Sequence, residues 1–245
     1  MRPARAVALG LLQGPAELLP ISSSAHVGLL IPREEPPAAR KEIEVALHLG
    51  TAIALALETR SVSRVALVAA APPALAGLAF ERVVEERLGT PVTIAAGLVA
   101  GSAAMVAADR VRPRRAKPEL VDGIVLGLAQ AAALFPGVSR SGATRAGARA
   151  RGFDRRAAAE LSREVALPVL GGAAVLKGYR LARRRPATSE LWALGASAAA
   201  AAVSTYGALR AERALAADAP LAAWAAYRTA LAAVIVGRVW HDRTR

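Results

Sequence analysis

The chain has 245 residues, of which 54% are hydrophobic, and its mean hydropathy is +0.35. A net charge of +13 would suit a nucleic-acid-binding protein, but only 4% of the residues are aromatic and no basic-aromatic pattern occurs. Because the sequence contains no cysteine, disulfides and thiolate metal sites are excluded.

Long uncharged runs recur along the chain. Residues 89–108 contain no charged side chain, and neither do residues 191–209. A run of about 20 apolar residues crosses the hydrocarbon core of a bilayer as a helix. Further uncharged runs lie at 45–57, 65–80 and 123–139, with a broken one at 214–237. An Ala-rich soluble bundle is the alternative, but soluble helices need regularly spaced polar faces. We therefore predict an all-α integral membrane protein with a single domain, residues 1–245.

The charged segments indicate how the chain is oriented. Residues 1–12 could begin a signal peptide, but the apolar run continues to Ile31, which favours a retained first segment. Arg and Lys gather between apolar runs at 109–117, 149–156 and 177–185. The positive-inside rule places such loops in the cytoplasm, so we expect the 109–117 loop there.

An internal repeat relates the two halves of the chain. Residues Leu9, Gly10, Leu11 and Gln13 recur 117 positions later as Leu126, Gly127, Leu128 and Gln130, and Ser22 and Ser24 recur as Ser139 and Ser141. Pro20 is matched by Pro136 with a shift of one residue. Each half, about 1–117 and 118–245, therefore holds an apolar helix, a proline break and a serine-rich restart.

Paired breaks of this kind are typical of inverted-repeat membrane proteins, whose ligand site lies where the breaks meet. Irregular backbone at membrane depth is tolerated only inside protein or along a wet cavity. The two apolar segments interrupted by proline are therefore predicted to be re-entrant hairpins that face one cavity.

The breaks carry groups suited to an oxyanion. Three serines, residues 22–24, precede one helix, and Ser139 or Ser141 can begin the other, with Arg140 at its mouth and Thr144 one turn in. Helix N-termini, hydroxyls and a guanidinium fork could together hold phosphate or pyrophosphate. The alternative for Ser22 and Ser24 is a hydroxyl that only bonds to its own helix backbone. The alternative for Arg140 is a lipid contact that snorkels to the headgroups.

Glu17 does not suit simple anion binding. A carboxylate repels phosphate unless a metal bridges the two or the carboxylate handles protons, and a charged residue inside a membrane is functional by default. Gln13 lies one turn earlier and could share a helix face with Glu17. Ser23 lies three residues before His26, close enough for a hydroxyl–imidazole pair.

Four other polar residues have structural interpretations. Glu44, His48 and Glu58 are expected at the membrane surface or along a cavity. Arg228, between Tyr227 and an apolar run, could be a structural ion-pair partner.

These motifs resemble the signatures of the undecaprenyl-pyrophosphate phosphatases, the integral-membrane family linked to bacitracin resistance. The resemblance rests on Gln13-x-x-x-Glu17, on LPISSSAH at 19–26 and on PGVSRSGAT at 136–144. Similar segments at 43–55, 167–168 and 226–228 extend it over essentially the whole chain.

The resemblance implies hydrolysis of undecaprenyl pyrophosphate to undecaprenyl phosphate and inorganic phosphate, which recycles the lipid carrier for cell-wall synthesis. It implies a multi-pass protein of the bacterial inner membrane, with six spanning helices, two re-entrant helical hairpins and a site that opens toward the extracytoplasmic side. Expected partners are the polyprenyl pyrophosphate and membrane lipids, not nucleic acid, and a homodimer stays open.

The resemblance also assigns roles. Glu17, Ser23, His26 and Arg140 would be the catalytic residues, and Glu17 would bind a divalent metal ion, Mg²⁺ or Ca²⁺. The residues expected to contact substrate are Gln13, Ser22, Ser24, Ser139, Ser141 and Thr144. The nucleophile stays open between Ser23, His26 and water.

Four departures from the family pattern are visible. Gln13 stands where many members have glutamate, which removes one metal ligand, and Ser24-Ala25 replaces a more usual Thr-Gly. His48 stands where glutamine is more common. Ser162-Arg163-Glu164 interrupts a segment that is normally apolar, and its charged pair would form a salt bridge inside the bundle or line the cavity.

Two rival functions belong to other classes. A transporter or flippase of an anionic lipid would share the broken helices but would need no proton-handling Glu17–His26 pair. A membrane scaffold without ligand would leave the repeated polar breaks unexplained.

Overall fold

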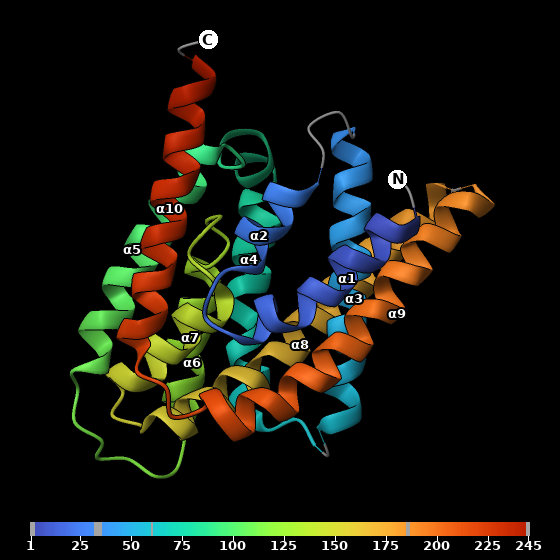
Figure 1. Ribbon diagram of the computed structural model, residues 1–245. Helices are drawn as coiled ribbons and strands as arrows, with labels where there is room; N and C mark the ends of the chain where they lie inside the picture. Colours follow the sequence, from blue (N-terminus) through green and yellow to red (C-terminus); the bar gives the residue numbers. More distant parts are fainter. Residues whose placement is uncertain (1–2, 32–35, 60, 185–186, 244–245) are drawn as a thin grey trace.

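The computed structural model describes residues 3–31, 36–59, 61–184 and 187–243, and all the regular structure in these ranges is helical (Figure 1). The helices are α1 (Pro3–Leu18), α2 (Ser23–Leu30), α3 (Pro37–Glu58), α4 (Arg64–Arg87), α5 (Pro91–Asp109), α6 (Leu120–Ala132), α7 (Arg140–Ala150), α8 (Arg155–Arg184), α9 (Thr188–Ala211), the π-helix η1 (Glu212–Ala216) and α10 (Leu221–Arg243). The all-α prediction is confirmed.

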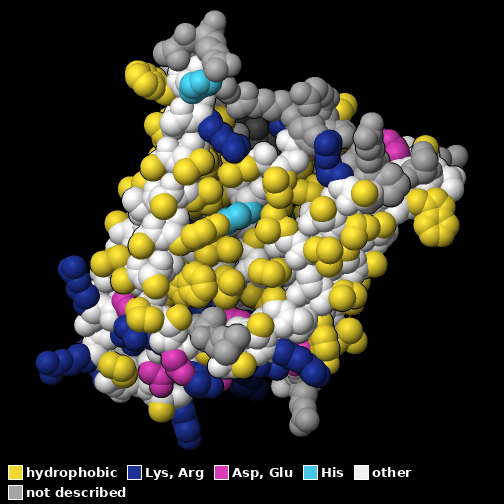
Figure 2. Space-filling model, in the orientation of Figure 1, with side chains coloured by type: hydrophobic (Ala, Val, Ile, Leu, Met, Phe, Trp, Pro, Cys, Tyr) yellow, Lys and Arg dark blue, Asp and Glu magenta, His cyan; other side chains and the backbone are white. Residues whose placement is uncertain are grey.

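Hydrophobic side chains cover the middle of the molecule, while Lys and Arg gather most densely at its lower end (Figure 2). Within the described ranges, α5 and α8 are the helices long and apolar enough to cross a membrane by length and composition. The expected six spans are not all recognised by this measure. Alanine, glycine and serine give α9 a modest hydropathy, and α6, at the second break, is short.

Two glycines at equivalent positions of the repeat allow close helix packing. A Cβ atom at Gly10 of α1 would lie 2.6 Å from the Ser197 carbonyl oxygen of α9. A Cβ atom at Gly127 of α6 would lie 2.9 Å from the Ala69 carbonyl oxygen of α4. Small residues let membrane helices approach backbone to backbone. Each interrupted helix is therefore fixed against a longer partner.

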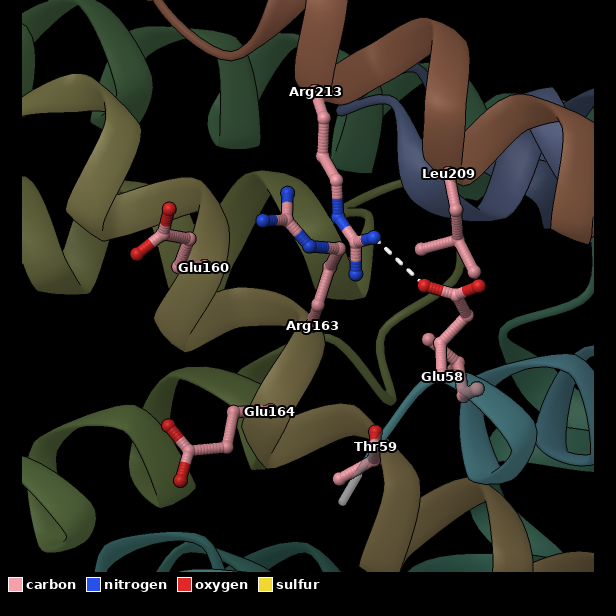
Figure 3. Close-up of a pocket in the computed structure, with 8 residues that line it drawn as sticks. Glu58, Thr59, Glu160, Arg163, Glu164, Leu209 and Arg213 are labelled. Atoms are coloured by element: carbon pink, nitrogen blue, oxygen red, sulfur yellow. Dashed lines mark hydrogen bonds and ion pairs between the residues drawn. The ribbon is translucent and has the colours of Figure 1, made fainter. Parts of the chain in front are cut away.

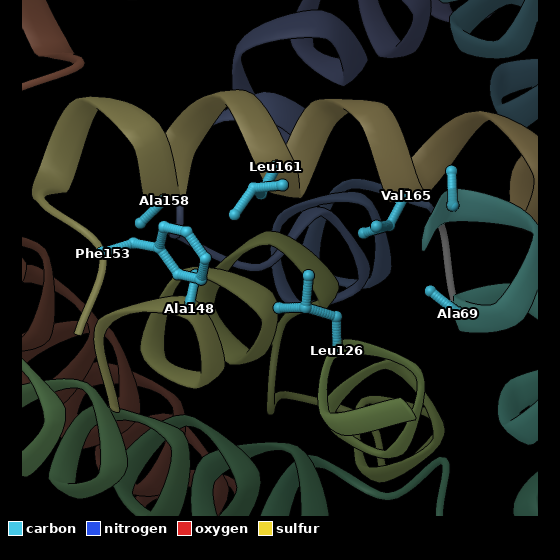
Figure 4. Packing of buried hydrophobic residues seen from close by; sticks show 8 residues of the cluster. Ala69, Leu126, Ala148, Phe153, Ala158, Leu161 and Val165 are labelled. Atoms are coloured by element: carbon cyan, nitrogen blue, oxygen red, sulfur yellow. The ribbon is translucent and has the colours of Figure 1, made fainter. Parts of the chain in front are cut away.

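An apolar cluster joins α6 and α7, the helices on either side of the second break, to α4 and α8. Phe153, which precedes α8 and is 1% exposed, packs with Leu126, Leu161 and Val165 and with alanines of α4, α7 and α8 (Figure 4). Helix α8 continues without interruption through Ser162-Arg163-Glu164. The cluster thus holds the N-terminal parts of α4 and α8 together.

The α1–α9 packing can be tested with two glycines. Gly14→Ala is expected to lower the thermal unfolding temperature in detergent, because its Cβ atom would lie 2.4 Å from the backbone of Ser204. At Gly207, within α9, a Cβ atom would meet nothing within 4 Å. Gly207→Ala should keep or raise stability, since glycine disfavours a helix by about 1 kcal/mol relative to alanine. Equal losses in both variants would contradict the close packing.

Candidate active site

The two breaks lie against each other, as the sequence predicted. The Ser141 hydroxyl at the start of α7 donates to the Leu19 carbonyl in the first break, at 2.9 Å. Arg140 contacts Glu17 of α1 in the same region. Residues from the two halves of the chain therefore form one polar centre.

Both breaks turn through a serine with left-handed backbone. Ser22 has φ 75° and Ser139 has φ 71°, and they are the residues with positive φ other than glycine in the described chain. Such a conformation is uncommon for a residue with a side chain and concentrates at functional sites. Each serine pairs with the hydroxyl two residues later, at 3.1 Å to Ser24 and 3.3 Å to Ser141.

The helices that restart after the breaks are capped differently. The Ser139 hydroxyl accepts the Gly142 N–H at 3.2 Å, which satisfies one free donor at the start of α7. Ser22 precedes α2 without such a side-chain bond. The N-terminus of α2 therefore keeps more of its backbone donors for other partners.

Arg228 of α10 joins the two breaks. Its guanidinium, fully buried, donates to the Pro20 carbonyl at 3.3 Å and to the Gly137 and Val138 carbonyls at 3.0 and 2.9 Å. It also donates to the Ser102 hydroxyl of α5 at 3.1 Å. The expected ion pair is wrong, because the broken helices leave carbonyl oxygens unpaired and the guanidinium satisfies these instead.

Glu17 is the hub of the polar centre. Its carboxylate, 4% exposed, accepts the Arg140 Nε–H at 3.1 Å on one oxygen. The other oxygen accepts the Ser23 hydroxyl at 2.5 Å and the Gln13 amide at 3.3 Å. His48 Nε2 lies 3.6 Å from that second oxygen. The carboxylate thus accepts hydrogen bonds from α1, α2 and α7, and His48 of α3 lies close by.

Arg140 is oriented by two helices. Its Nη1 donates to the Ser162 carbonyl of α8 at 3.1 Å, and its Nη2 donates to the Glu17 carbonyl at 3.4 Å. The side chain is 11% exposed. The interpretation of Arg140 as a lipid contact is therefore wrong, since the guanidinium points inward.

A cavity of about 590 Å³ opens beside this centre. The polar residues along its wall include Glu17, Ser22, Ser23, Ser24, Glu44, His48, Ser139, Arg140 and Ser141. Most of the predicted site residues thus share one cavity. His48 and Glu44 were expected at a surface or along a cavity, and the structure shows the second.

His26 lies elsewhere. Its Nδ1 donates to the Ser22 carbonyl at 2.8 Å, since a carbonyl only accepts, and its Nε2 then accepts the Tyr227 hydroxyl at 2.6 Å. The two rings are stacked, with centroids 5.7 Å apart. The predicted Ser23–His26 pair is wrong, because Ser23 donates to the charged carboxylate of Glu17 instead.

Two predicted substrate contacts also need correction. Thr144 is fully buried, donates to the Arg140 carbonyl at 2.9 Å and shares a 2.6 Å hydrogen bond with Ser162. Gln13 is 1% exposed and its amide supports Glu17. Both side chains hydrogen-bond to neighbouring residues of the site, and neither is among the residues that line the cavity.

A second charged network braces the end of α1. Arg163 contacts Glu212 of η1 rather than its neighbour Glu164. Glu212 also accepts from Arg145 Nη2 at 2.9 Å, and the same nitrogen donates to the Leu18 carbonyl at 3.0 Å. No sequence motif pointed to Glu212, which is 2% exposed and pairs across 67 residues with Arg145.

A smaller cavity of about 210 Å³ lies beside this network (Figure 3). Glu58 lines it and forms an ion pair with Arg213 at 2.7 Å, while Glu160 and Glu164 point away from that pair. Glu58 therefore does not belong to the centre around Glu17.

The donor set limits how a metal ion could bind. In the described part of the chain, no three His, Cys, Asp or Glu side chains are grouped to hold one. A metal cage built from protein alone does not fit. A single carboxylate such as Glu17 does fit Mg²⁺ that is also bound by substrate phosphates, the usual arrangement for this ion.

The sequence matches a known protein family and several of its members. The family model described as "Bacitracin resistance protein BacA" matches residues 6–234. The chain belongs to this family. An undecaprenyl-diphosphatase of Geobacter sulfurreducens is 36% identical over 82% of this chain and 85% of its own length. One from Moorella thermoacetica is 37% identical, over 71% and 75% respectively. This confirms the resemblance that the BacA-type motifs indicated.

The Arg228 contacts predict a structural phenotype in this BacA family member. Arg228→Lys should lower both the thermal unfolding temperature and the activity, because an ammonium cannot span the carbonyls of both breaks. Each buried carbonyl left unpaired costs about 1–3 kcal/mol. Arg238→Lys, on an exposed position of the same helix, is the matched control. If Arg228→Lys were as stable as the wild-type protein, the structure of the two breaks would not depend on the Arg228 guanidinium.

Proposed function

We propose that this chain is a membrane phosphatase that hydrolyses undecaprenyl pyrophosphate to undecaprenyl phosphate and inorganic phosphate. The observation that carries the proposal is the meeting of Glu17, Ser23 and Arg140 around one cavity. The relatives from Geobacter sulfurreducens and Moorella thermoacetica support it, because both are named undecaprenyl-diphosphatase and neither is named as a transporter. These relatives give no support to the alternative function as a transporter or flippase.

Binding of the pyrophosphate would use the groups at both breaks. Arg140 would donate to phosphate oxygens in place of its bond to the Glu17 carboxylate, and the serine hydroxyls and the N-terminus of α2 would add neutral donors. These donors are already fixed by the protein, so they stabilise the charge of the transition state without reorganising. A substrate phosphate would take the place that Glu17 occupies beside Arg140.

Ser23 is the nucleophile that the geometry favours. Its hydroxyl donates to Glu17 at 2.5 Å, so Glu17 can accept the proton as Ser23 Oγ attacks the terminal phosphorus. The bond to the bridging oxygen then breaks, undecaprenyl phosphate leaves, and water releases phosphate from the serine. Alternatively, Glu17 deprotonates a water that attacks directly. Attack by His26 is disfavoured, because both ring nitrogens already have hydrogen-bond partners and His26 is not among the residues that line the cavity.

A divalent cation, Mg²⁺ or Ca²⁺, would be held by Glu17 together with the pyrophosphate oxygens. When bound, it would neutralise the charge that accumulates on the phosphates. A chelator should therefore abolish phosphate release by the purified protein, and added Mg²⁺ should restore it. Full activity in the chelator would remove the metal from the proposal.

We further propose that the halves 1–117 and 118–245 are inverted repeats within one domain. The packing supports this, since α1 lies along α9 as α6 lies along α4. The left-handed Ser22 and Ser139 occupy equivalent positions. The α1–α2 and α6–α7 pairs would then be the re-entrant hairpins of a multi-pass protein of the bacterial inner membrane.

The clearest test of function is Arg140→Lys. Lysine keeps the charge but loses the planar fork, so phosphate release should fall by about 10²–10³, the usual cost of one oxyanion-stabilising donor. Thermal stability should change little. Arg156→Lys, at an exposed position, is the control. A lysine variant that retains most of its phosphate release would show that the Arg140 guanidinium does not bind the pyrophosphate.

The orientation can be tested with single cysteines, since the chain has none of its own. Ala116→Cys in the basic loop should resist membrane-impermeant thiol reagents in intact cells, because basic loops stay in the cytoplasm. Gly89→Cys, at an exposed position near the other end of the membrane-spanning candidate α5, should react. The reverse labelling pattern would show that the chain has the opposite orientation in the membrane.

A further inference from the structure

His48 of α3 lies beside the carboxylate of Glu17 and lines the same cavity. Its side chain is 37% exposed, whereas that of Glu17 is 4% exposed. The proposed reaction does not use this imidazole. The ring is nevertheless accessible to a group that enters the cavity with the substrate.

The orientation of the ring is fixed by its own helix. The Nδ1 atom of His48 donates to the Glu44 carbonyl, one turn earlier in α3, at 2.8 Å, since a carbonyl only accepts. In the neutral ring, Nε2 therefore carries the lone pair, and this atom faces Glu17. Histidines that bind metal ions almost always donate their other ring N–H to a carboxylate or a backbone carbonyl, which fixes the tautomer. His48 already has this arrangement.

The distance between the two side chains also suits two ligands of one ion. His48 Nε2 lies 3.6 Å from Glu17 Oε2. Ligand atoms that are about 2.1 Å from one cation, at tetrahedral or octahedral angles, lie about 3.0–3.4 Å from each other. A direct hydrogen bond between charged groups would instead be about 2.7–2.9 Å long. The observed spacing is therefore nearer to that of a bridging cation than to that of a direct salt bridge.

His26 provides a comparison within the same protein. Its Nδ1 likewise donates to a backbone carbonyl, that of Ser22, at 2.8 Å. However, its Nε2 accepts the Tyr227 hydroxyl at 2.6 Å, so its lone pair is already used. His26 is also not among the residues that line the main cavity. Of these two histidines, His48 is the one whose Nε2 faces both a carboxylate and the cavity.

We propose that His48 Nε2 and Glu17 Oε2 are the two protein ligands of the divalent cation. The proposal rests on the proposed function, because phosphate oxygens of the substrate and water would complete the coordination. Mg²⁺ and Ca²⁺ take oxygen ligands, whereas imidazole suits ions of the first transition series. His48 therefore makes the site favour a divalent transition-metal ion over Mg²⁺. The Ser23 hydroxyl is bonded to the same Glu17 oxygen, so the ion would lie beside the proposed nucleophile.

Electron paramagnetic resonance can detect the nitrogen ligand without any turnover. Mn²⁺ would be added to the purified protein together with methylenediphosphonate, a pyrophosphate analogue whose carbon bridge is not hydrolysed. The spin echo of the bound Mn²⁺ in the wild-type protein should be modulated by an imidazole nitrogen. His48→Gln should lose this modulation, because an amide side chain binds a cation through its oxygen. His26→Gln is the matched control and should keep it.

Metal affinity should change in parallel. For His48→Gln, the Kd of Co²⁺ in the presence of methylenediphosphonate should rise at least about tenfold, since losing even the partner of a metal ligand costs about 10–100-fold. The Kd of Mg²⁺ should change by less than about threefold, because the glutamine oxygen can take the place of the nitrogen. Glu17→Gln should weaken the binding of both ions. Equal losses of Co²⁺ and Mg²⁺ binding in His48→Gln would contradict a preference set by the imidazole.

These measurements separate the metal ligand from the catalytic proposal. Nitrogen modulation that depends on His48 would support the ligand even if the protein released no phosphate. Wild-type protein that binds Mn²⁺ without nitrogen modulation, or His48→Gln protein that keeps the modulation, would refute His48 as a ligand, whatever the activity. The wild-type result needs no variant, so the test does not depend on the folding of His48→Gln.

Discussion

Two interrupted helices can face each other inside a membrane protein only if their unpaired backbone groups find partners, because the bilayer core offers no water. Arg228 meets most of this requirement. It lies on α10, far from either break in sequence, yet its guanidinium binds the carbonyls of Pro20, Gly137 and Val138. With those carbonyls satisfied, the two breaks can hold a left-handed serine each and present their hydroxyls to the cavity.

The buried charges follow from the same constraint. Glu17 would be costly as an isolated carboxylate, and it is surrounded by Arg140, Ser23 and Gln13. The pairing also prepares the chemistry, since the carboxylate that balances Arg140 in the absence of substrate is the one that can accept a proton from Ser23. Pyrophosphate, with more negative charge than Glu17, is a natural competitor for Arg140.

The sequence predicted which residues meet at this site, but not all of the contacts between them. Repeated Gln, Pro and Ser positions predicted two breaks that meet, and the structure places Glu17, Ser23 and Arg140 there. Contacts that depend on distant packing could not be inferred. Tyr227 lies 201 residues from His26, and nothing in the sequence indicated that it would hold the imidazole outside the cavity.

Hydropathy was similarly informative about class but not about detail. It predicted an all-α membrane protein, yet alanine-rich α9 and short α6 do not stand out as spans. Arg228 stands beside an apolar run, but the choice between a carboxylate partner and free carbonyls is made by backbone geometry. That geometry exists only once α5, α10 and both breaks are assembled.

The central claim is that the two breaks form one catalytic unit through Glu17 and Arg140. A double-mutant cycle measures this directly, by comparing phosphate release from undecaprenyl pyrophosphate in Glu17→Gln, Arg140→Lys and the combined variant. If the residues act together, the double variant should be about as slow as the slower single variant, at unchanged thermal stability. If the two losses multiply, Glu17 and Arg140 act independently and the account of a shared site is contradicted.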